Sequence, residues 1–514
     1  MVNITLLNKI LQNYLFCLFC GKIDKVSVLV KMDGNMAILE KELATNLKKI
    51  NRKEEEISRL DISDEELASI DKEYCTYGDK IHADANPKVF RDCNGSFMYD
   101  SENVPYLDLE MWFAACNLGY KNKRIRDAVV NQLDTLPQIS SHFQYDYKVL
   151  LSEKIAKANI KRFGRKGRVH FNVGGSQVIE DALKLVRNYT HKNRMFSFFG
   201  GFHGRTLGAS CLTAGYRYRK AFGHFADEAH FVPYPYCFRC PYGKKCDSCN
   251  YYCVQQLRRE FEDNCAGIYD HSSKECAMGA FFVEPVQGSG GYIIPPKGYF
   301  KELKKVLDDF GVLLVDDEIQ MGFYRTGKLW AMEHYDVKPD VITFSKSLTN
   351  GLNPLGGMWA KEELINPEIW PNGRTHSTFC NNPIGMRAGY EVMCTFEEGD
   401  FEREVANKGK YFLDGLKELE KRHKRIGFVD GLGLALRIEC VTEDGYTPDP
   451  ELLNKILAEG LKGNLSYNGK KCGLILNKGS HYNNTITLVP AVTISYAEID
   501  MALSLLDQLF TKLS

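Results

Sequence analysis

Short apolar runs alternate with helical stretches over residues 168–345, and this alternation constrains the fold more than any other feature of the chain. The stretches between the runs, such as 177–190 and 297–310, have the spacing of helices that bury one face. This rhythm is typical of a mostly parallel sheet with helices on both faces. Ligands of such sheets bind at the carboxyl ends of the strands, so polar residues that follow the runs are the first site candidates. The runs are VHF, MFSFF, GAFFV, GVLLV and DVITF.

Size, charge and cysteine usage narrow the class of protein. The chain has 514 residues, 44% of them hydrophobic, and a single core seldom grows beyond about 300 residues, so we expect more than one domain. Lys plus Arg equals Asp plus Glu, 66 each, which favours neither a nucleic-acid partner nor an anionic membrane surface. The apolar run at 14–20 is far shorter than the about 20 residues of a spanning helix. The 17 scattered cysteines favour a reducing compartment, and we predict a cytoplasmic protein.

The pattern along the chain predicts a division into parts. Ser63 and Glu66 have the spacing of a capping box at the start of a charged helical arm. Alternating residues around a turn at 101–103 predict a hairpin, and we expect it to complete a second domain formed by the helices and strands after Pro383. The predicted parts are an N-terminal extension with the helical arm (1–75), the N-terminal part of the small domain (76–135), a large domain (136–383) with a Cys-rich insertion (237–253), and the C-terminal small domain (384–514).

Two charged residues follow neighbouring apolar runs, Asp317 after GVLLV and Lys346 after DVITF. A carboxylate at the end of a buried strand can keep a pyridine nitrogen protonated, and a lysine beside it can form a Schiff base with the aldehyde of the cofactor. The released lysine amine can then move protons between substrate and cofactor carbons. The pair therefore predicts a pyridoxal phosphate site in which Lys346 and Asp317 are catalytic. The plain alternative is a helix-capping aspartate and a solvated loop lysine.

Several further words of the sequence, in this order, resemble those of the class III (omega) aminotransferases, which are fold type I pyridoxal phosphate enzymes. The resemblance runs from about Asn86 to the C-terminus. It implies an α/β fold: a large domain with a mostly parallel, seven-stranded type of sheet and a smaller α+β domain. It also implies a homodimer with shared active sites, which moves an amino group from an amine or amino acid to a 2-oxo acid. The words are GGSQV, GGFHGRTLG, FFVEPVQGSGG, DDEIQ, FSKS and HSTFCNNP.

The resemblance assigns cofactor-binding roles to the matching residues. The cofactor phosphate would lie at a helix N-terminus, on small residues that allow the backbone amides to approach it. One aromatic side chain would stack on the ring, with a histidine beside it, and a glutamate would support the region of the ring-binding aspartate. One threonine would reach the phosphate of the neighbouring subunit's cofactor. These residues are Gly175, Ser176, Phe202, His203, Glu284, Gln287 (lining the site), Gln320 (at the phenolate oxygen) and Thr378.

The substrate side departs from the family pattern. Many members pair a glutamate with an arginine that grips a substrate carboxylate, but this chain has Ser289 and Asp430 at those positions. Arg437 is a candidate replacement, because a guanidinium can pair with a carboxylate from another position in the chain. Trp112 and Phe113, with Tyr120, match the substrate-pocket loop of the family, where aromatic residues commonly set the shape of the pocket.

Five cysteines lie close together in the insertion, with two C-x2-C pairs among them. Such spacing can form a thiolate site for zinc or for an iron–sulfur cluster, in a structural role. The alternative is a set of free thiols. The five residues are Cys237, Cys240, Cys246, Cys249 and Cys253.

Three other functions remain open at this point. A racemase or epimerase and a decarboxylating transaminase would share all the cofactor residues, and they differ in whether an amino group is transferred to a 2-oxo acid. An inactive metal-binding scaffold on the same fold would lack turnover altogether, although Lys346 and Asp317 are both retained.

Overall fold

The computed structural model describes residues 62–78, 87–220, 222 and 229–513, and the chain divides into two compact units, 1–87 and 88–514. The described part of the first unit is one helix, α3 (Asp64–Tyr74). The Ser63 hydroxyl accepts a hydrogen bond from the backbone N–H of Glu66 at 3.1 Å, so the predicted N-cap is confirmed. No residue of α3 is buried, as expected of a charged surface arm.

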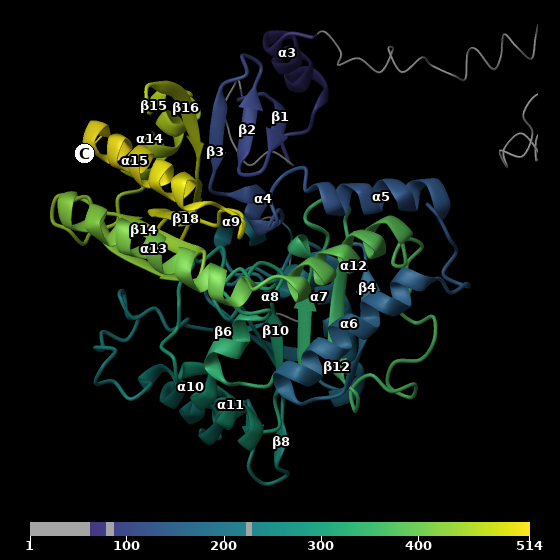
Figure 1. Cartoon of the computed structure of the whole chain (residues 1–514). Coiled ribbons are helices and arrows are strands. Elements are labelled where there is room, and N and C mark those ends of the chain that lie inside the picture. Colours follow the sequence, from purple (N-terminus) through teal and green to yellow (C-terminus); the bar gives the residue numbers. More distant parts are fainter. Residues whose placement is uncertain (1–61, 79–86, 221, 223–228, 514) are drawn as a thin grey trace, which may run out of the picture. The chain divides into compact units, whose positions relative to one another are not determined.

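A seven-stranded sheet forms the centre of the second unit, in the order β4-β12-β11-β10-β9-β5-β6 (Figure 1). Neighbouring strands are parallel except β12, which runs antiparallel to both β11 and β4. The alternation of apolar runs therefore predicted this sheet correctly. The strands are β4 (Gly167–Asn172), β5 (Arg194–Phe198), β6 (His230–Val232), β9 (Met278–Val283), β10 (Leu313–Asp317), β11 (Val341–Phe344) and β12 (Gly356–Lys361).

Helices cover both faces of the sheet, and β9 shows how the sequence specifies this. Successive strand residues point to opposite faces. Phe282 belongs to the hydrophobic cluster that includes α7 (Gly175–Thr190), whereas Phe281 belongs to the cluster that includes α11 (Tyr299–Asp309). All six residues of β9 are buried, which explains why this strand is a continuous apolar run instead of an alternating one.

A smaller sheet joins the two ends of the second unit. The five-stranded sheet β1-β2-β3-β16-β15 pairs the N-terminal hairpin with the C-terminal segment through parallel β3 and β16. The predicted hairpin, and its union with the C-terminal part, are therefore confirmed; the exact domain bounds stay a prediction. The five strands are β1 (Phe90–Asn94), β2 (Phe97–Asp100), β3 (Pro105–Asp108), β15 (Leu465–Tyr467) and β16 (Lys470–Ile475).

The other small sheet has the order β13-β14-β18-β17, and β7 pairs with β8 in a separate ribbon. These strands are β13 (Ile426–Leu432), β14 (Ala435–Cys440), β17 (Asn477–Gly479), β18 (Thr485–Leu488), β7 (Tyr269–Asp270) and β8 (Glu275–Cys276). The remaining α-helices are α4 (Met111–Ala114), α5 (Lys123–Thr135), α6 (Asp146–Phe163), α8 (Leu207–Leu212), α9 (Tyr216–Arg219), α10 (Tyr252–Glu262), α12 (Pro383–Glu398), α13 (Phe401–Arg422), α14 (Pro450–Leu461) and α15 (Tyr496–Leu513). None of the described helices is long and apolar enough to cross a membrane.

Arg325 links the loop after β10 to the small sheets. Its side chain is fully buried, and its guanidinium donates to the carbonyl oxygens of Leu434 and Pro490 and to the side-chain oxygen of Asn117. Burial lowers the pKa of Arg325 to about 10. The adjoining Gly433 has a φ of +57°, and a Cβ atom there would lie 2.4 Å from the Thr326 carbonyl carbon. This junction therefore has little freedom to accept other side chains.

Candidate active site

Three charged residues meet where the central strands end. Asp317 is the last residue of β10, Glu284 follows β9 directly, and Lys346 lies two residues beyond β11. Because β9, β10 and β11 are parallel neighbours, their carboxyl ends lie at one edge of the sheet. The structure thus brings together the three residues that the sequence placed after apolar runs.

Asp317 is held by His203. Nδ1 of His203 lies 2.7 Å from Oδ2 of Asp317, and the two side chains are 1% and 4% exposed. The other carboxylate oxygen accepts a hydrogen bond from the Ile319 backbone N–H at 3.1 Å. Burial alone would lower the pKa of His203, but the hydrogen bond and the charge of Asp317 raise it above its usual value. The contact therefore favours the protonated form of the His203 imidazole.

Lys346 is an unusual lysine in both conformation and charge. It begins a short 3-10 turn, η3 (Lys346–Thr349), with a φ of +42°, in the left-handed region that non-glycine residues rarely adopt. Burial lowers its pKa to about 8, against the opposing charges of Asp317, Glu284 and Glu110. A lysine with this pKa has a substantial neutral fraction near neutral pH, which a nucleophilic amine or a proton carrier requires.

Glu284 connects the strand end to the loop that carries Phe202. Its two carboxylate oxygens accept hydrogen bonds from the backbone N–H groups of Phe202, at 2.9 Å, and Gly288, at 2.8 Å. Burial raises the pKa of Glu284 to about 7, although the charge of His203 opposes this shift. The Phe202 ring lies edge-on to Tyr218, with 5.2 Å between ring centroids.

The start of α7 has the features of an anion cradle. The N-cap, Gly174, has no side chain to satisfy the first backbone N–H groups of the helix. Gly175 is closely approached, because a Cβ there would lie 3.2 Å from Cδ1 of Ile319, near Asp317. The Ser176 hydroxyl accepts from the Arg205 backbone N–H at 3.3 Å. Glycine in the first turn therefore serves close packing, and the free N–H groups suit a phosphate.

The two predicted glutamines are both held in place. Gln287 is fully buried; its amide donates to the Phe199 carbonyl at 2.8 Å, and its oxygen lies 3.1 Å from Nε2 of His481. Gln320 donates to the hydroxyl of Tyr292 at 2.9 Å.

Thr378, Trp112 and Phe113 are more exposed than Asp317 and Glu284. Thr378 is exposed on the loop before α12, and the neighbouring Phe379 is 68% exposed. Trp112 is 59% exposed and Phe113 is half-buried. Tyr120 donates a hydrogen bond to Asp108 at 2.6 Å.

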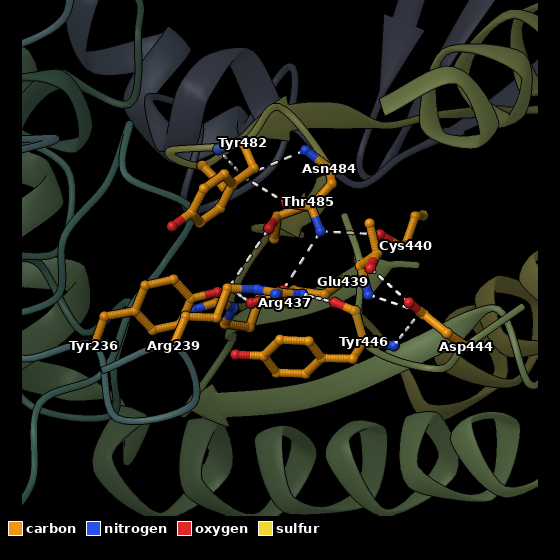
Figure 2. A network of polar contacts seen from close by, with 12 residues as sticks. Tyr236, Arg239, Arg437, Glu439, Cys440, Asp444, Tyr446, Tyr482, Asn484 and Thr485 are labelled. Carbon is orange, nitrogen blue, oxygen red and sulfur yellow. Dashed lines mark hydrogen bonds and ion pairs between the residues drawn. The ribbon is translucent and has the colours of Figure 1, made fainter. Parts of the chain in front are cut away.

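Arg437 is buried in a polar network instead of lying open to a pocket. It is 1% exposed, forms an ion pair with Glu439, and donates to the hydroxyl of Tyr236 at 2.8 Å. Figure 2 shows Arg239 on the same carboxylate, 2.9 Å from Glu439. Burial lowers the pKa of Arg437 to about 9 and raises that of Glu439 to about 7. Because Arg437 and Glu439 are two residues apart on β14, they share one face of the strand.

The cysteine insertion is a loop that leads into α10. Sγ of Cys237 lies 2.8 Å from Sγ of Cys246, and none of the fifteen cysteines that the structure describes forms a disulfide. Over the described residues, no group of three or more His, Cys, Asp or Glu side chains has a geometry that could hold a metal ion. The predicted zinc or iron–sulfur site at Cys237, Cys240, Cys246, Cys249 and Cys253 is therefore not supported.

Sequence reasoning did not single out Glu110, whose electrostatic environment is coupled to that of Lys346. Its pKa is raised to about 8 by burial and by the charge of Asp108, whereas the charge of Lys346 lowers it. The signal in the sequence was an acidic residue two positions before the aromatic pair Trp112 and Phe113, between the apolar residues Leu109 and Met111.

The chain was compared with known proteins. The family model of class-III aminotransferases matches residues 82–510. The chain is 31% identical to a leucine/methionine racemase of Thermococcus litoralis over 428 residues, which is 82% of this chain and 90% of the racemase. It is 30% identical to an acetylornithine aminotransferase of Caldanaerobacter subterraneus subsp. tengcongensis over 425 residues, which is 82% of this chain and 93% of the aminotransferase. The chain is also similar to a solved transaminase structure from Virgibacillus, with a TM-score of 0.76 and 25% identity. The match covers 87% of this chain and 98% of the Virgibacillus chain.

These matches and the strand-end geometry agree on the fold and on the reaction. The fold is that of fold type I pyridoxal phosphate transaminases. The reaction is the transfer of an amino group from an amine or amino acid to a 2-oxo acid. The chain belongs to the class-III aminotransferase family of pyridoxal phosphate-dependent enzymes.

Proposed function

We propose that Lys346 is the residue that binds pyridoxal phosphate covalently and carries the proton in this aminotransferase, with Asp317 as the partner of the ring nitrogen. The observation that supports this proposal is the buried group at the strand ends. It contains a lysine whose pKa is lowered to about 8 and an aspartate fixed by a histidine at 2.7 Å. Perturbed charges in a deep, preorganised group are typical of active sites.

The residues of this edge fit the cofactor at three points. A phosphate would lie on the uncapped N-terminus of α7 at Gly175 and Ser176, where the helix dipole favours an anion. The pyridine nitrogen would face Asp317, and Phe202 would stack on the ring. When bound, the cofactor supplies an electron sink for the negative charge that develops on the carbon of the amino donor.

The protein's own groups would control protons and orientation. His203 holds the Asp317 carboxylate in a fixed rotamer, because it binds Oδ2 while the Ile319 N–H binds Oδ1. In its neutral form, Nζ of Lys346 takes the proton from the donor carbon, and in its charged form it returns a proton. Glu284 fixes the loop that carries Phe202, and Gln320 would contact the phenolate oxygen.

The chain is proposed to act as a homodimer in which Thr378 serves the neighbouring subunit's cofactor phosphate. Thr378 is exposed, and large apolar side chains on segments that flank the site are exposed with it. Exposed apolar groups of this kind mark association surfaces. They include Trp112 (59% exposed), Leu207 (71%), Leu352 (46%) and Phe379 (68%).

Hybrid dimers test the shared site. Thr378→Val should weaken cofactor binding, and Lys346→Ala should abolish turnover while leaving the fold. Mixed dimers of the two variants contain one site with an intact lysine and an intact threonine from the partner, so that site should regain wild-type cofactor affinity. Cofactor affinity that stays weak in the hybrids would refute the sharing, and full activity of Lys346→Ala would refute the mechanism.

Racemisation is a second candidate, because the relatives include racemases and because Ser289 and Asp430 replace the residues that grip a substrate carboxylate in many members. An amino acid donor incubated in deuterated water without a 2-oxo acid decides between the two functions. Transamination bleaches the yellow band of the lysine-bound cofactor and yields the 2-oxo acid of the donor. Racemisation leaves the band, and deuterium enters both enantiomers.

The compartment is proposed to be the cytoplasm. None of the fifteen described cysteines forms a disulfide, and several of them are exposed, as is usual where thiols are kept reduced.

A further inference from the structure

The loop that carries Glu110 is attached to the segment that carries Lys346. The Ser347 hydroxyl donates to the Ala114 carbonyl at 2.5 Å. The Asn350 side chain accepts from the Leu118 N–H at 2.8 Å and donates to the Gly119 carbonyl at 2.9 Å. Three hydrogen bonds therefore join residues 114–119 to residues 347–350, directly beside the catalytic lysine.

The backbone turns sharply between Glu110 and this attachment. Met111, Trp112, Phe113 and Ala114 all have φ between +45° and +64°, a left-handed turn without a glycine. Such a conformation is unfavourable for residues with a Cβ atom and persists only where the surroundings hold it. Asp108 holds its start, because its Oδ1 accepts from the N–H groups of Glu110, at 2.7 Å, and Met111, at 2.9 Å. The turn thus fixes where Glu110 lies relative to Lys346.

The Glu110 carboxylate has no partner in the part of the chain that the structure describes: no hydrogen bond or ion pair of this group is found there. It is half-buried, and its charge and that of Lys346 act on one another. Its charge also acts on Tyr292, which binds Gln320. A half-buried carboxylate without a partner, at the reacting lysine, is costly unless a ligand uses it.

The cations around the site are already engaged. Arg437 is paired with Glu439, and both terminal nitrogens of Arg325 donate to backbone and amide oxygens. Neither guanidinium is free to neutralise Glu110 or to bind a second carboxylate of a substrate. Electrostatic complementarity then favours a donor that brings its own positive charge.

We propose that Glu110 is a specificity-determining residue that binds a second, non-reacting ammonium group of the amino donor, so that the preferred donors are diamines or amino acids with a cationic side chain. This inference rests on the proposed amino transfer at Lys346. The donor presents one amine to the reacting centre, and the other forms a charge-assisted hydrogen bond with the Glu110 carboxylate.

The same residue can tolerate the anionic acceptor. Even with Lys346 beside it, Glu110 has a pKa of about 8, which leaves the group largely protonated at neutral pH, so it does not repel a 2-oxo acid. A bound ammonium group favours the ionised form and lowers that pKa. One side chain can therefore serve both half-reactions by changing its protonation state.

The test compares donors of equal length with and without the second charge. kcat/KM is measured for 1,4-diaminobutane and for 1-aminobutane, with pyruvate as the acceptor, in the holoenzyme and in Glu110→Gln. A hydrogen bond to a charged group corresponds to about ten- to hundredfold in affinity, so the ratio of diamine to monoamine should fall by about that factor. The value for 1-aminobutane should change by less than about threefold. Glu363→Gln, at an exposed carboxylate outside the site, should change neither value.

The outcomes separate the inference from the function on which it rests. Glu110→Asp, which keeps the charge, should recover part of the diamine preference. Equal loss for both donors in Glu110→Gln, or an unchanged ratio, overturns the specificity role. A wild-type enzyme that uses both donors without preference also overturns it but leaves amino transfer intact. Transfer from no amine or amino acid at all is the result that refutes the proposed function itself. Melting curves and the cofactor's visible band verify that each variant is folded and loaded.

Discussion

Replacing Lys346 by methionine should stabilise the cofactor-free protein while abolishing its activity. Methionine keeps an unbranched side chain of similar length but has no charge to bury. Lys346 is a desolvated amine whose pKa falls from 10.5 to about 8, and no hydrogen-bond partner of its Nζ is found among the described residues. This decrease in the pKa of Lys346 corresponds to about 3 kcal/mol of unfavourable free energy that the charged lysine contributes to the folded state.

The pH dependence follows from the sign of that shift. The folded state releases the lysine proton at a lower pH than the unfolded chain, so between pH 8 and 10.5 the unfolded chain binds more protons. Stability of the wild type should therefore rise with pH across this window, and the penalty is complete below pH 8. Lys346→Met should be about 3 kcal/mol more stable at pH 7, and the difference should vanish near the upper end of the window.

Urea unfolding of the two apoproteins, at one protomer concentration and several pH values, measures this difference. The wild type with bound cofactor is not a valid reference, because binding adds its own stability. A Lys346→Met apoprotein with wild-type stability at pH 7 and the same pH profile would refute the reasoning, since it would show that the lysine is not desolvated in the folded state.

Three further changes have expected costs. His203→Leu leaves the buried Asp317 carboxylate without its partner, so it should lower the free energy of unfolding by about 3 kcal/mol and weaken cofactor binding more than about tenfold. Urea unfolding and cofactor titration measure the two effects. His203→Asn should recover part of both the stability and the cofactor affinity. Arg325→Met leaves three buried acceptor oxygens without donors and should lower the free energy of unfolding by about 3 kcal/mol. A much smaller loss would show that water replaces the guanidinium at those oxygens. Gly433→Ala places a Cβ against Thr326 at positive φ and should cost about 2 kcal/mol in thermal or urea unfolding, whereas an unchanged midpoint would show that the junction relaxes.

Sequence reasoning reached the central sheet and placed Asp317 and Lys346 at one edge of it, because both results depend on local patterns. Asp317 and Lys346 each follow an apolar run, and parallel neighbours necessarily bring such positions together. The partner of Asp317 was harder to find, since His203 is distant in sequence and its role depends on a loop conformation. Arg437 was misplaced for another reason: it shares a strand face with Glu439, and this i, i+2 relation already indicated an internal pair.

Glu110 and the cysteines show the limit of spacing arguments. The four residues after Glu110 include no glycine, so nothing in their types predicts a left-handed turn; tertiary hydrogen bonds impose it. The cysteine spacing, in turn, is compatible with both a metal site and free thiols, and only the directions of the side chains distinguish the two.

The parallel pairing of β3 with β16 has a consequence for how the protein is made. Tyr106 and Gly473 are register partners, although nearly the whole second unit lies between them in the sequence. At a synthesis rate of about 5–20 residues per second, β3 emerges from the ribosome on the order of tens of seconds before the strand that completes its sheet. During that interval β3 presents an unpaired edge, which other chains can join. The nascent chain therefore depends on protection of this hairpin, and slowed translation before residue 470 should increase aggregation.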